Sequence, residues 1–315
     1  MPRKTLQQLA DHLIREAKAP FTAELFLKKI QERWNRRIAP NTLNSLLRDL
    51  SGHQLLIGTK SCDYLPLRAV FEKIQHIRLT LTLTQVEQSH NLLIPGYRLI
   101  PFLSNEITEN QITFLDEHNI EIPKLKRSFT LEDIFDLYKY SNEWHFPDEI
   151  KINEWMPGKS SLTITAWDIC PLIDRLEKYK TETLTAELLD YDAGIFRLAS
   201  YSKSEQNLYQ LKNRNLYVSM EKALVQLSQD FDFSAYGLEK QLLSAFYLQS
   251  HTTLDLPAFS IKTFLESLEK LSVVGCEWGK PRLTPSDKNR NWNSFLELAP
   301  RKSLGKCDSL DSIFR

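Results

Sequence analysis

Five polar residues between positions 40 and 50 have the types and the spacing needed to touch the bases of a nucleic acid. Leucines recur there at helical intervals, at positions 43, 46, 47 and 50, so one face of a helix in this segment is apolar. The opposite face then carries Asn41, Thr42, Asn44, Ser45 and Arg48. An asparagine amide can form two hydrogen bonds with adenine, and an arginine guanidinium can form two with guanine. The pattern therefore predicts a helix whose outer face reads base edges.

Three basic residues flank this helix and could bind the phosphates of the same nucleic acid. Arg36 and Arg37 come just before it, and Lys60 falls in a polar turn after it. Phosphate contacts fix the register of a protein on a duplex, whereas base contacts give specificity. The alternative interpretation is a solvated helix face, because surface helices commonly display asparagine, serine and arginine.

The elements around these residues have the order of a winged helix-turn-helix. Apolar residues at helical spacing predict helices over residues 5–18 and 22–34, before the third helix at 41–50. Pro40 suits the start of that third helix, and Gly52 suits its end. Two short apolar runs, 53–58 and 64–67, enclose a polar turn and predict a β-hairpin. In a winged helix the third helix enters the major groove.

The first 70 residues resemble the HARE-type helix-turn-helix family, which occurs in the delta subunit of bacterial RNA polymerase and beside some restriction enzymes. The resemblance is carried by TLQQLADHLI, APFTAELFLKKI and IAPNTLNSLLRDL, with a proline, a threonine and leucines in similar places: Pro40, Thr42, Leu43 and Leu47. The glycine that the family has near Ala17–Pro20 is absent here. The resemblance implies a role linked to DNA or to RNA polymerase.

The rest of the chain predicts an α+β multidomain protein with three parts. We expect a winged helix-turn-helix at 1–72, an α+β domain with a mostly antiparallel sheet at 76–203, and a mainly helical domain at 205–315. The alternation in IRLTLTLT predicts a half-buried strand with Ile77, Leu79, Leu81 and Leu83 on one face. Near residues 236–285 the order of a leucine-striped helix and two short strands repeats, which leaves a second winged helix open.

Charge is unevenly distributed, although the net charge of the chain is zero. Residues 1–70 carry +6, residues 71–200 carry −8, and residues 201–315 carry +2. The first segment would attract phosphates and the second would repel them. The acidic middle domain is thus expected to meet a protein partner rather than DNA.

Catalytic motifs give little support for an enzyme. The sequence has no glycine-rich phosphate-binding loop and no HxxxH pair, and its four cysteines are far apart. One weak set remains: Asp116, Glu121 and Lys124 are similar to the metal-binding carboxylates and lysine of restriction-type nucleases. Pro123 inside that set is unfavourable for the strand it needs.

These observations predict a non-enzymatic, DNA-binding or transcription-associated protein that docks through its N-terminal winged helix. The expected partners are duplex DNA, a protein that binds the acidic middle domain and, as an open alternative, a second copy of the chain; no cofactor or metal is expected. The first alternative is a protein-interaction scaffold that uses the winged helix for assembly, and the second is a nuclease subunit. No apolar run has the roughly 18 residues of a membrane helix, and no signal peptide is recognisable, so a cytoplasmic location is expected.

Overall fold

The structure is a computed structural model of the 315-residue chain. It describes residues 5–34, 36–50, 55–59, 62–74, 76–104, 107–140, 149–151, 160–179, 182–200, 203–230, 236–249, 258–275 and 281–286. We call residues 5–66 the N-terminal unit, residues 76–200 the middle part and residues 203–286 the C-terminal part. Among the helices described, none combines the length and the apolar composition that spanning a membrane requires.

The N-terminal unit consists of three helices followed by a two-stranded antiparallel ribbon. The elements are α1 (Leu6–Glu16), α2 (Ala23–Arg33), α3 (Pro40–Leu50), β1 (Leu55–Thr59) and β2 (Cys62–Pro66). Hydroxyl caps fix where the first two helices begin: the Thr5 side chain accepts from the Gln8 amide, and the Thr22 side chain accepts from the Leu25 amide. The three helices and the hairpin predicted from the sequence are therefore all present.

The N-terminal unit has a hydrophobic core of its own. Its buried residues come from all three helices and include Leu13, Ile30 and Leu47. Phe21, between α1 and α2, pairs with Tyr64 on β2 through two backbone hydrogen bonds of 3.1 and 3.2 Å. This bridge ties the helices to the ribbon, because it adds a third, single-residue strand beside β2.

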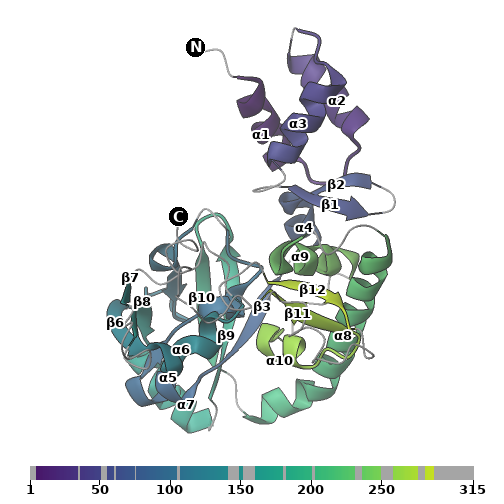
Figure 1. The fold of residues 1–315 in the computed structure, drawn as a ribbon. Helices are drawn as coiled ribbons and strands as arrows, with labels where there is room; N and C mark the ends of the chain where they lie inside the picture. Colours follow the sequence, from purple (N-terminus) through teal and green to yellow (C-terminus); the bar gives the residue numbers. More distant parts are fainter. Residues whose placement is uncertain are drawn as a thin grey trace, which may run out of the picture.

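A short helix, α4 (Leu67–Lys73), joins the N-terminal unit to the rest of the chain. Figure 1 shows the three helices projecting from the body, with α4 and the ribbon at the junction. Three residues of α4 make contacts with other parts of the chain. Glu72 pairs with Lys18 at 3.1 Å, and the Phe71 ring lies 4.5 Å from that of Tyr191. Lys73 donates to the carbonyl of Tyr247. The helix therefore touches all three parts of the molecule.

The middle part contains one sheet that is built around the predicted alternating strand. Its order is β3 (Arg78–Thr82), β9 (Thr183–Asp190), β10 (Ile195–Ser200) and β5 (Thr113–Leu115). All pairs are antiparallel except β10 with β5. Ile77, Leu79, Leu81 and Leu83 are buried, which confirms the predicted apolar face. A tight turn at residues 191–194 joins β9 to β10, and Gly194 adopts a φ of +63° there.

A second antiparallel sheet lies beside the first, whereas the sequence had predicted a single sheet. It contains β4 (Leu92–Leu93), β6 (Lys124–Thr130), β7 (Glu149–Lys151) and β8 (Ser161–Asp168), with β8 paired to the other three. Trp167 on β8 packs edge-on against Phe114 on β5, at a centroid distance of 5.0 Å. Alternation along a strand shows which face is buried but not which strand pairs with it, so the split was not visible in the sequence.

Short helices cover these sheets, and a buried ion pair lies beside them. The helical elements are α5 (Gln85–His90), η1 (Gly96–Leu99), η2 (Glu109–Gln111), α6 (Leu131–Tyr138) and α7 (Cys170–Tyr179).

Arg98 on η1 and Glu87 on α5 are almost completely buried and pair at 2.5 Å. The Glu87 carboxylate also accepts from the Ile94 and Thr84 amides, and Arg98 donates to the Thr82 carbonyl. These bonds satisfy both buried charges, as such a pair requires.

The C-terminal part contains three helices followed by another antiparallel strand pair. These are α8 (Lys203–Asp230), α9 (Leu238–Leu248), α10 (Ile261–Glu266), β11 (Leu271–Val274) and β12 (Arg282–Pro285). Gln241 fastens α9 to β12, because its side chain bonds both the amide and the carbonyl of Leu283. The predicted hairpin tip at 277–280 lies outside the described residues.

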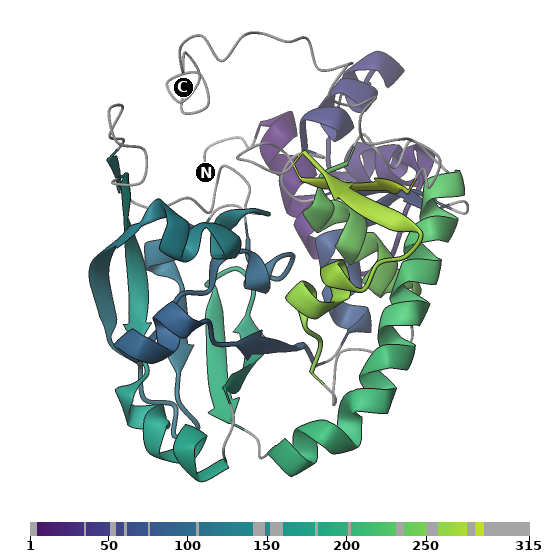
Figure 2. The same cartoon turned by 60° about the horizontal axis from the view of Figure 1, so that its bottom comes forward.

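The middle and C-terminal parts share one hydrophobic core. Phe259, from the segment before α10, pairs with β3 through backbone bonds of 2.9 Å to Thr80 and Arg78. A single cluster of buried residues extends from Leu65 through the first sheet and Trp167 to Leu283. Most buried side chains of the second sheet, such as Phe129 and Ile164, form a separate, smaller cluster with α6. Figure 2 shows the two parts side by side, with α8 along the outer side. The predicted boundary at 203–205 stays a prediction, and the core is continuous across it.

Candidate nucleic-acid interface

The outer face of α3 carries four of the predicted base-reading side chains. Leu43 and Leu47 point into the core of the N-terminal unit and are 3% and 0% exposed. Asn41, Thr42, Asn44 and Ser45 are exposed, as the leucine spacing predicts. α3 begins at Pro40, whose missing N–H costs nothing at the first position of a helix. The backbone of Arg48 belongs to α3, but its side chain lies outside the described residues.

Arg36 and Arg37 lie in the segment that leads into α3, and both are exposed. Ile38, directly after them, is buried in the N-terminal core and anchors the segment. The two guanidinium groups therefore precede the polar helix face on a stretch of chain that is fixed at both ends. Lys60, predicted at the tip of the ribbon, lies outside the described residues.

Ion pairs neutralise the basic residues on one side of the N-terminal unit only. Arg15 pairs with Asp11 at 2.9 Å, Lys18 with Glu72 at 3.1 Å, and Arg33 with Glu16 at 3.8 Å. Hydrogen bonding to Lys18, and the Lys18 charge, hold the pKa of Glu72 below its ordinary value. These pairs involve α1 and α4, and they leave little net positive charge there.

Four other basic residues make no ion pair within the described part of the chain. They are Lys28 and Lys29 on α2, and Arg36 and Arg37 before α3. The sequence placed Lys28 and Lys29 on an outer face without assigning them to the site. What distinguishes them is the absence of an acidic partner, which only the structure gives. The cations without an ion-pair partner thus lie on α2 and on the segment leading into α3; α2 also carries two exposed carboxylates, Glu24 and Glu32, whereas the Arg36–Arg37 segment carries none.

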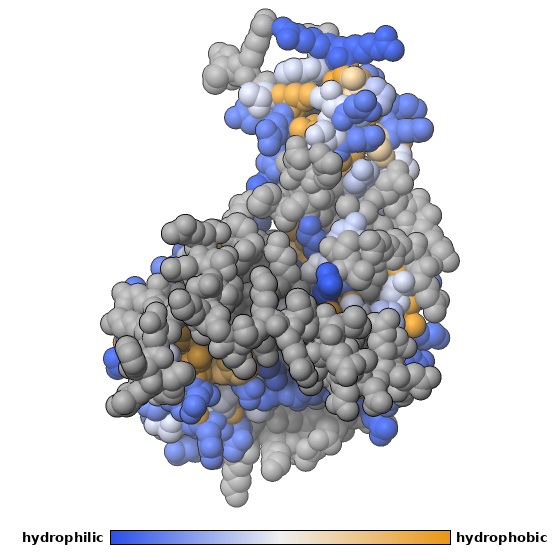
Figure 3. Space-filling view, viewed as in Figure 1, coloured by the Kyte–Doolittle hydropathy of each residue, from blue (hydrophilic) through white to orange (hydrophobic). Residues whose placement is uncertain are grey.

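The surface of the N-terminal unit is mostly hydrophilic. In the space-filling view (Figure 3), strongly hydrophilic residues cover much of the unit, with smaller apolar areas between them. One large apolar side chain on α2, Leu25, is 54% exposed. A single exposed leucine is ordinary on a protein surface and does not define an apolar patch.

Asp116, Glu121 and Lys124, which are similar to nuclease residues, make contacts with residues close to them in the sequence. Asp116 Oδ1 accepts from the amides of His118 and Ile120, both at 2.8 Å, and so closes a turn. Lys124 Nζ lies 3.7 Å from Glu121 Oε1 at the surface. In the described ranges, no three His, Cys, Asp or Glu side chains gather in a way that could hold a metal ion.

Comparison with protein-family models, with curated proteins and with solved structures found no match to this chain.

Proposed function

We propose that the N-terminal unit is a winged helix, of HARE type, that docks the protein on duplex DNA. In this proposal α3 enters the major groove, and its exposed Asn41 and Asn44 reach base edges. Arg36 and Arg37 bind the phosphates beside that groove. The protein is then a DNA-binding or transcription-associated protein whose middle and C-terminal parts serve another partner.

The order of the elements supports the winged-helix assignment. Three helices precede an antiparallel ribbon, and the Phe21–Tyr64 bridge adds a strand residue between the first and second helices. The stacked rings of Phe21 and Phe26, 4.9 Å apart, hold this bridge against α2. The third helix is consequently fixed by its buried face, and its polar face is left outward.

The observation that carries the DNA proposal is the combination of that polar face with unneutralised positive charge. Lys28, Lys29, Arg36 and Arg37 have no acidic partner in the described residues, whereas the basic residues near α4 do. Unpaired cations attract phosphates, because binding releases counterions from the DNA. The three helices project from the body (Figure 1).

A second candidate function, assembly with a protein, is favoured by the position of the ribbon. β1 lies against α8 and α9 of the C-terminal part, so one strand of the ribbon is already engaged in a contact within the chain. We also propose that α8–α10 with β11 and β12 is a second winged helix, because it has the same order of elements.

The test is binding of the full chain to a random-sequence duplex, measured by fluorescence anisotropy at about 50 mM salt. The double variant Arg36→Ala/Arg37→Ala is expected to bind at least about tenfold more weakly, because it loses two phosphate contacts. The matched control is Arg214→Ala/Lys222→Ala, which removes two exposed positive charges from α8.

The control variant is expected to keep the wild-type affinity. Equal losses in both double variants would show that only the total charge matters, and would overturn the assignment to α3. If the wild type does not bind duplex DNA, the assembly function takes the first place, and pull-downs with the middle part become the next experiment.

A further inference from the structure

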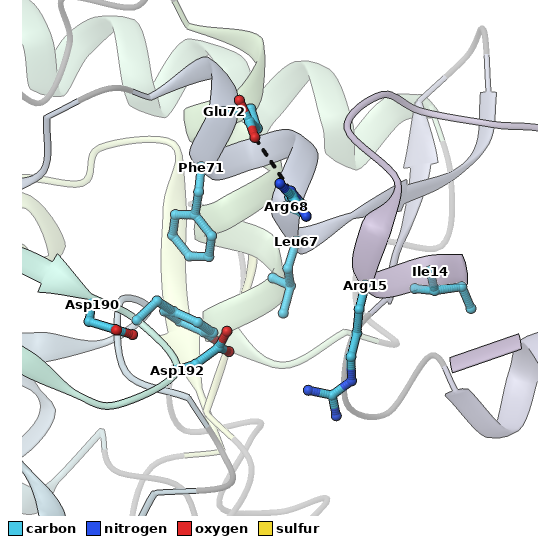
Figure 4. Close-up of a pocket in the computed structure, with 9 residues that line it drawn as sticks. Ile14, Arg15, Leu67, Arg68, Phe71, Glu72, Asp190 and Asp192 are labelled. Atoms are coloured by element: carbon cyan, nitrogen blue, oxygen red, sulfur yellow. Dashed lines mark hydrogen bonds and ion pairs between the residues drawn. The ribbon is translucent and has the colours of Figure 1, made fainter. Parts of the chain in front are cut away.

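A cavity of about 530 Å³ lies between the N-terminal unit, α4 and the middle part. α1 contributes Ile14 and Arg15, α4 contributes Leu67 and Phe71, and the turn after β9 contributes Tyr191 and Asp192. Figure 4 shows Leu67 and Phe71 of α4 between the turn, with Asp190 and Asp192, on one side and Arg15 of α1 on the other. The volume falls within the range of pockets that bind small organic molecules.

One wall of the cavity is apolar. The rings of Phe71 and Tyr191 lie 4.5 Å apart at an interplanar angle of 41°, and Leu67 and Ile14 extend the apolar surface. Leu67 and Ile14 are themselves buried, so they are fixed in place by the cores behind them. A wall of this kind suits the face of a planar or aliphatic ligand.

The charged groups around the cavity are unequally neutralised. Arg15 pairs with Asp11 at 2.9 Å, and Arg68 lies 3.4 Å from Glu72, which also binds Lys18. Both guanidinium groups at the rim therefore already have carboxylate partners.

The two carboxylates of the turn differ from these arginines, since Asp190 and Asp192 form no ion pair within the described part of the chain. Asp190 Oδ1 accepts a hydrogen bond from the Ala193 amide, at 2.9 Å. Figure 4 shows Asp192 across the cavity from Arg15. Because Glu72 is shared by Lys18 and Arg68, one positive charge remains at the rim against the two carboxylates of the turn, so the balance at this cavity is negative and the negative groups lie at the turn.

We propose that this cavity binds a small organic cation with a flat apolar body. The amine or amidine group pairs with Asp192 and Asp190, and the apolar body lies against Leu67 and the Phe71–Tyr191 wall. A cation near the face of Tyr191 gains a further attraction from the ring. Because such a ligand touches α1, α4 and the β9–β10 turn, it joins the N-terminal unit to the body.

The experiment is a calorimetric titration of the full chain with benzamidine, and with benzoate as a ligand of similar shape and opposite charge. Saturable binding of benzamidine, at least about tenfold tighter than that of benzoate, is expected from the charge of the turn. This comparison uses the wild-type protein, so it does not depend on the folding of any variant. No DNA is present, so its outcome is independent of the proposed DNA binding.

The double variant Asp190→Asn/Asp192→Asn is expected to weaken benzamidine binding at least tenfold and to reduce the preference over benzoate. Its control, Asp136→Asn, removes an exposed carboxylate that pairs with Lys139 on α6 and should leave binding unchanged. The proposal is overturned if benzamidine does not saturate, if benzoate binds equally well, or if the double variant binds benzamidine like the wild type.

Discussion

At the scale of single residues, the candidate interface depends on which side chains of α3 face outward and on which nearby cations have a carboxylate partner. Leu43 and Leu47 fixed the outward direction of Asn41 and Asn44, because one buried face of a helix defines the other. The sequence could not separate Lys28 and Lys29, which have no acidic partner among the described residues, from Lys18, whose partner Glu72 is 54 positions away. The candidate site therefore gained α2 only from the structure.

The ion pair of Arg98 and Glu87 is a residue-level feature whose energy can be measured. Both side chains are at most 2% exposed, and the pair is 2.5 Å long. Arg98→Met leaves the Glu87 carboxylate buried without its counter-charge and should lower the free energy of unfolding by about 3–5 kcal/mol. Urea denaturation followed by circular dichroism measures this loss.

The control for that prediction is Arg127→Met on the exposed surface of β6, which should change the free energy of unfolding by less than about 0.5 kcal/mol. Similar values for the two variants would mean that the Arg98–Glu87 pair contributes no more than a surface charge does.

At the scale of elements, sequence periodicity located most helices and strands but not all of their ends. The helical pattern of residues 260–271 predicts a helix over that whole range, yet α10 ends at Glu266. Glu221 Oε1 on α8 accepts from the amides of Glu269, Lys270 and Leu271, at 2.8, 2.6 and 3.2 Å. The Glu221 carboxylate that accepts these bonds is about fifty positions away in the sequence. The local spacing of apolar residues therefore could not predict where α10 ends.

Gly96 is a position at which one element requires glycine. Its φ is +53°, and a Cβ atom there would lie 2.2 Å from the carbonyl oxygen of Leu137 on α6. Gly96→Ala should destabilise the protein by more than about 2 kcal/mol, since the backbone strain alone costs about 1–3 kcal/mol. The change in melting temperature, read by differential scanning calorimetry, checks this value.

Gly237→Ala is the matched control for Gly96→Ala. A Cβ atom at Gly237 meets nothing nearer than the Pro281 carbonyl oxygen at 4.0 Å, and the φ of Gly237 is −67°. That variant should melt within about 2 °C of the wild type. If both alanine variants melt alike, the close approach of η1 to α6 is not a constraint on the fold.

At the scale of the whole molecule, the described residues form a small core in the N-terminal unit, a large one shared by the other two parts, and a third between the second sheet and α6. Leu47 is fully buried in the first, and Leu224 on α8 is fully buried in the second. The sequence predicted three consecutive parts from changes in the spacing of apolar residues along the chain. It could not show that Phe259 would pair with β3, because that contact joins residues about 180 positions apart.

The N-terminal core and the large shared core predict two separable stabilities. Leu47→Ala should destabilise the N-terminal unit by about 2–5 kcal/mol, speed amide exchange in α1–α3 and leave exchange in β9 and β10 unchanged. Leu224→Ala should have the opposite pattern. Hydrogen exchange with mass spectrometry reads both regions at once. Faster exchange across the whole chain in Leu47→Ala would show instead that the molecule unfolds as one unit.

The central claim is that positive charge beside α3 binds DNA phosphates, and the salt dependence of duplex binding tests it most directly. Anisotropy titrations of the wild type between about 50 and 200 mM salt should give a falling affinity, with a slope of log K against log salt of roughly −0.9 for each phosphate contact. Arg36→Ala/Arg37→Ala should make that slope shallower by about 1.8, for two lost contacts. A wild type that does not bind at the lowest salt, or a slope that the double variant leaves unchanged, would contradict the account.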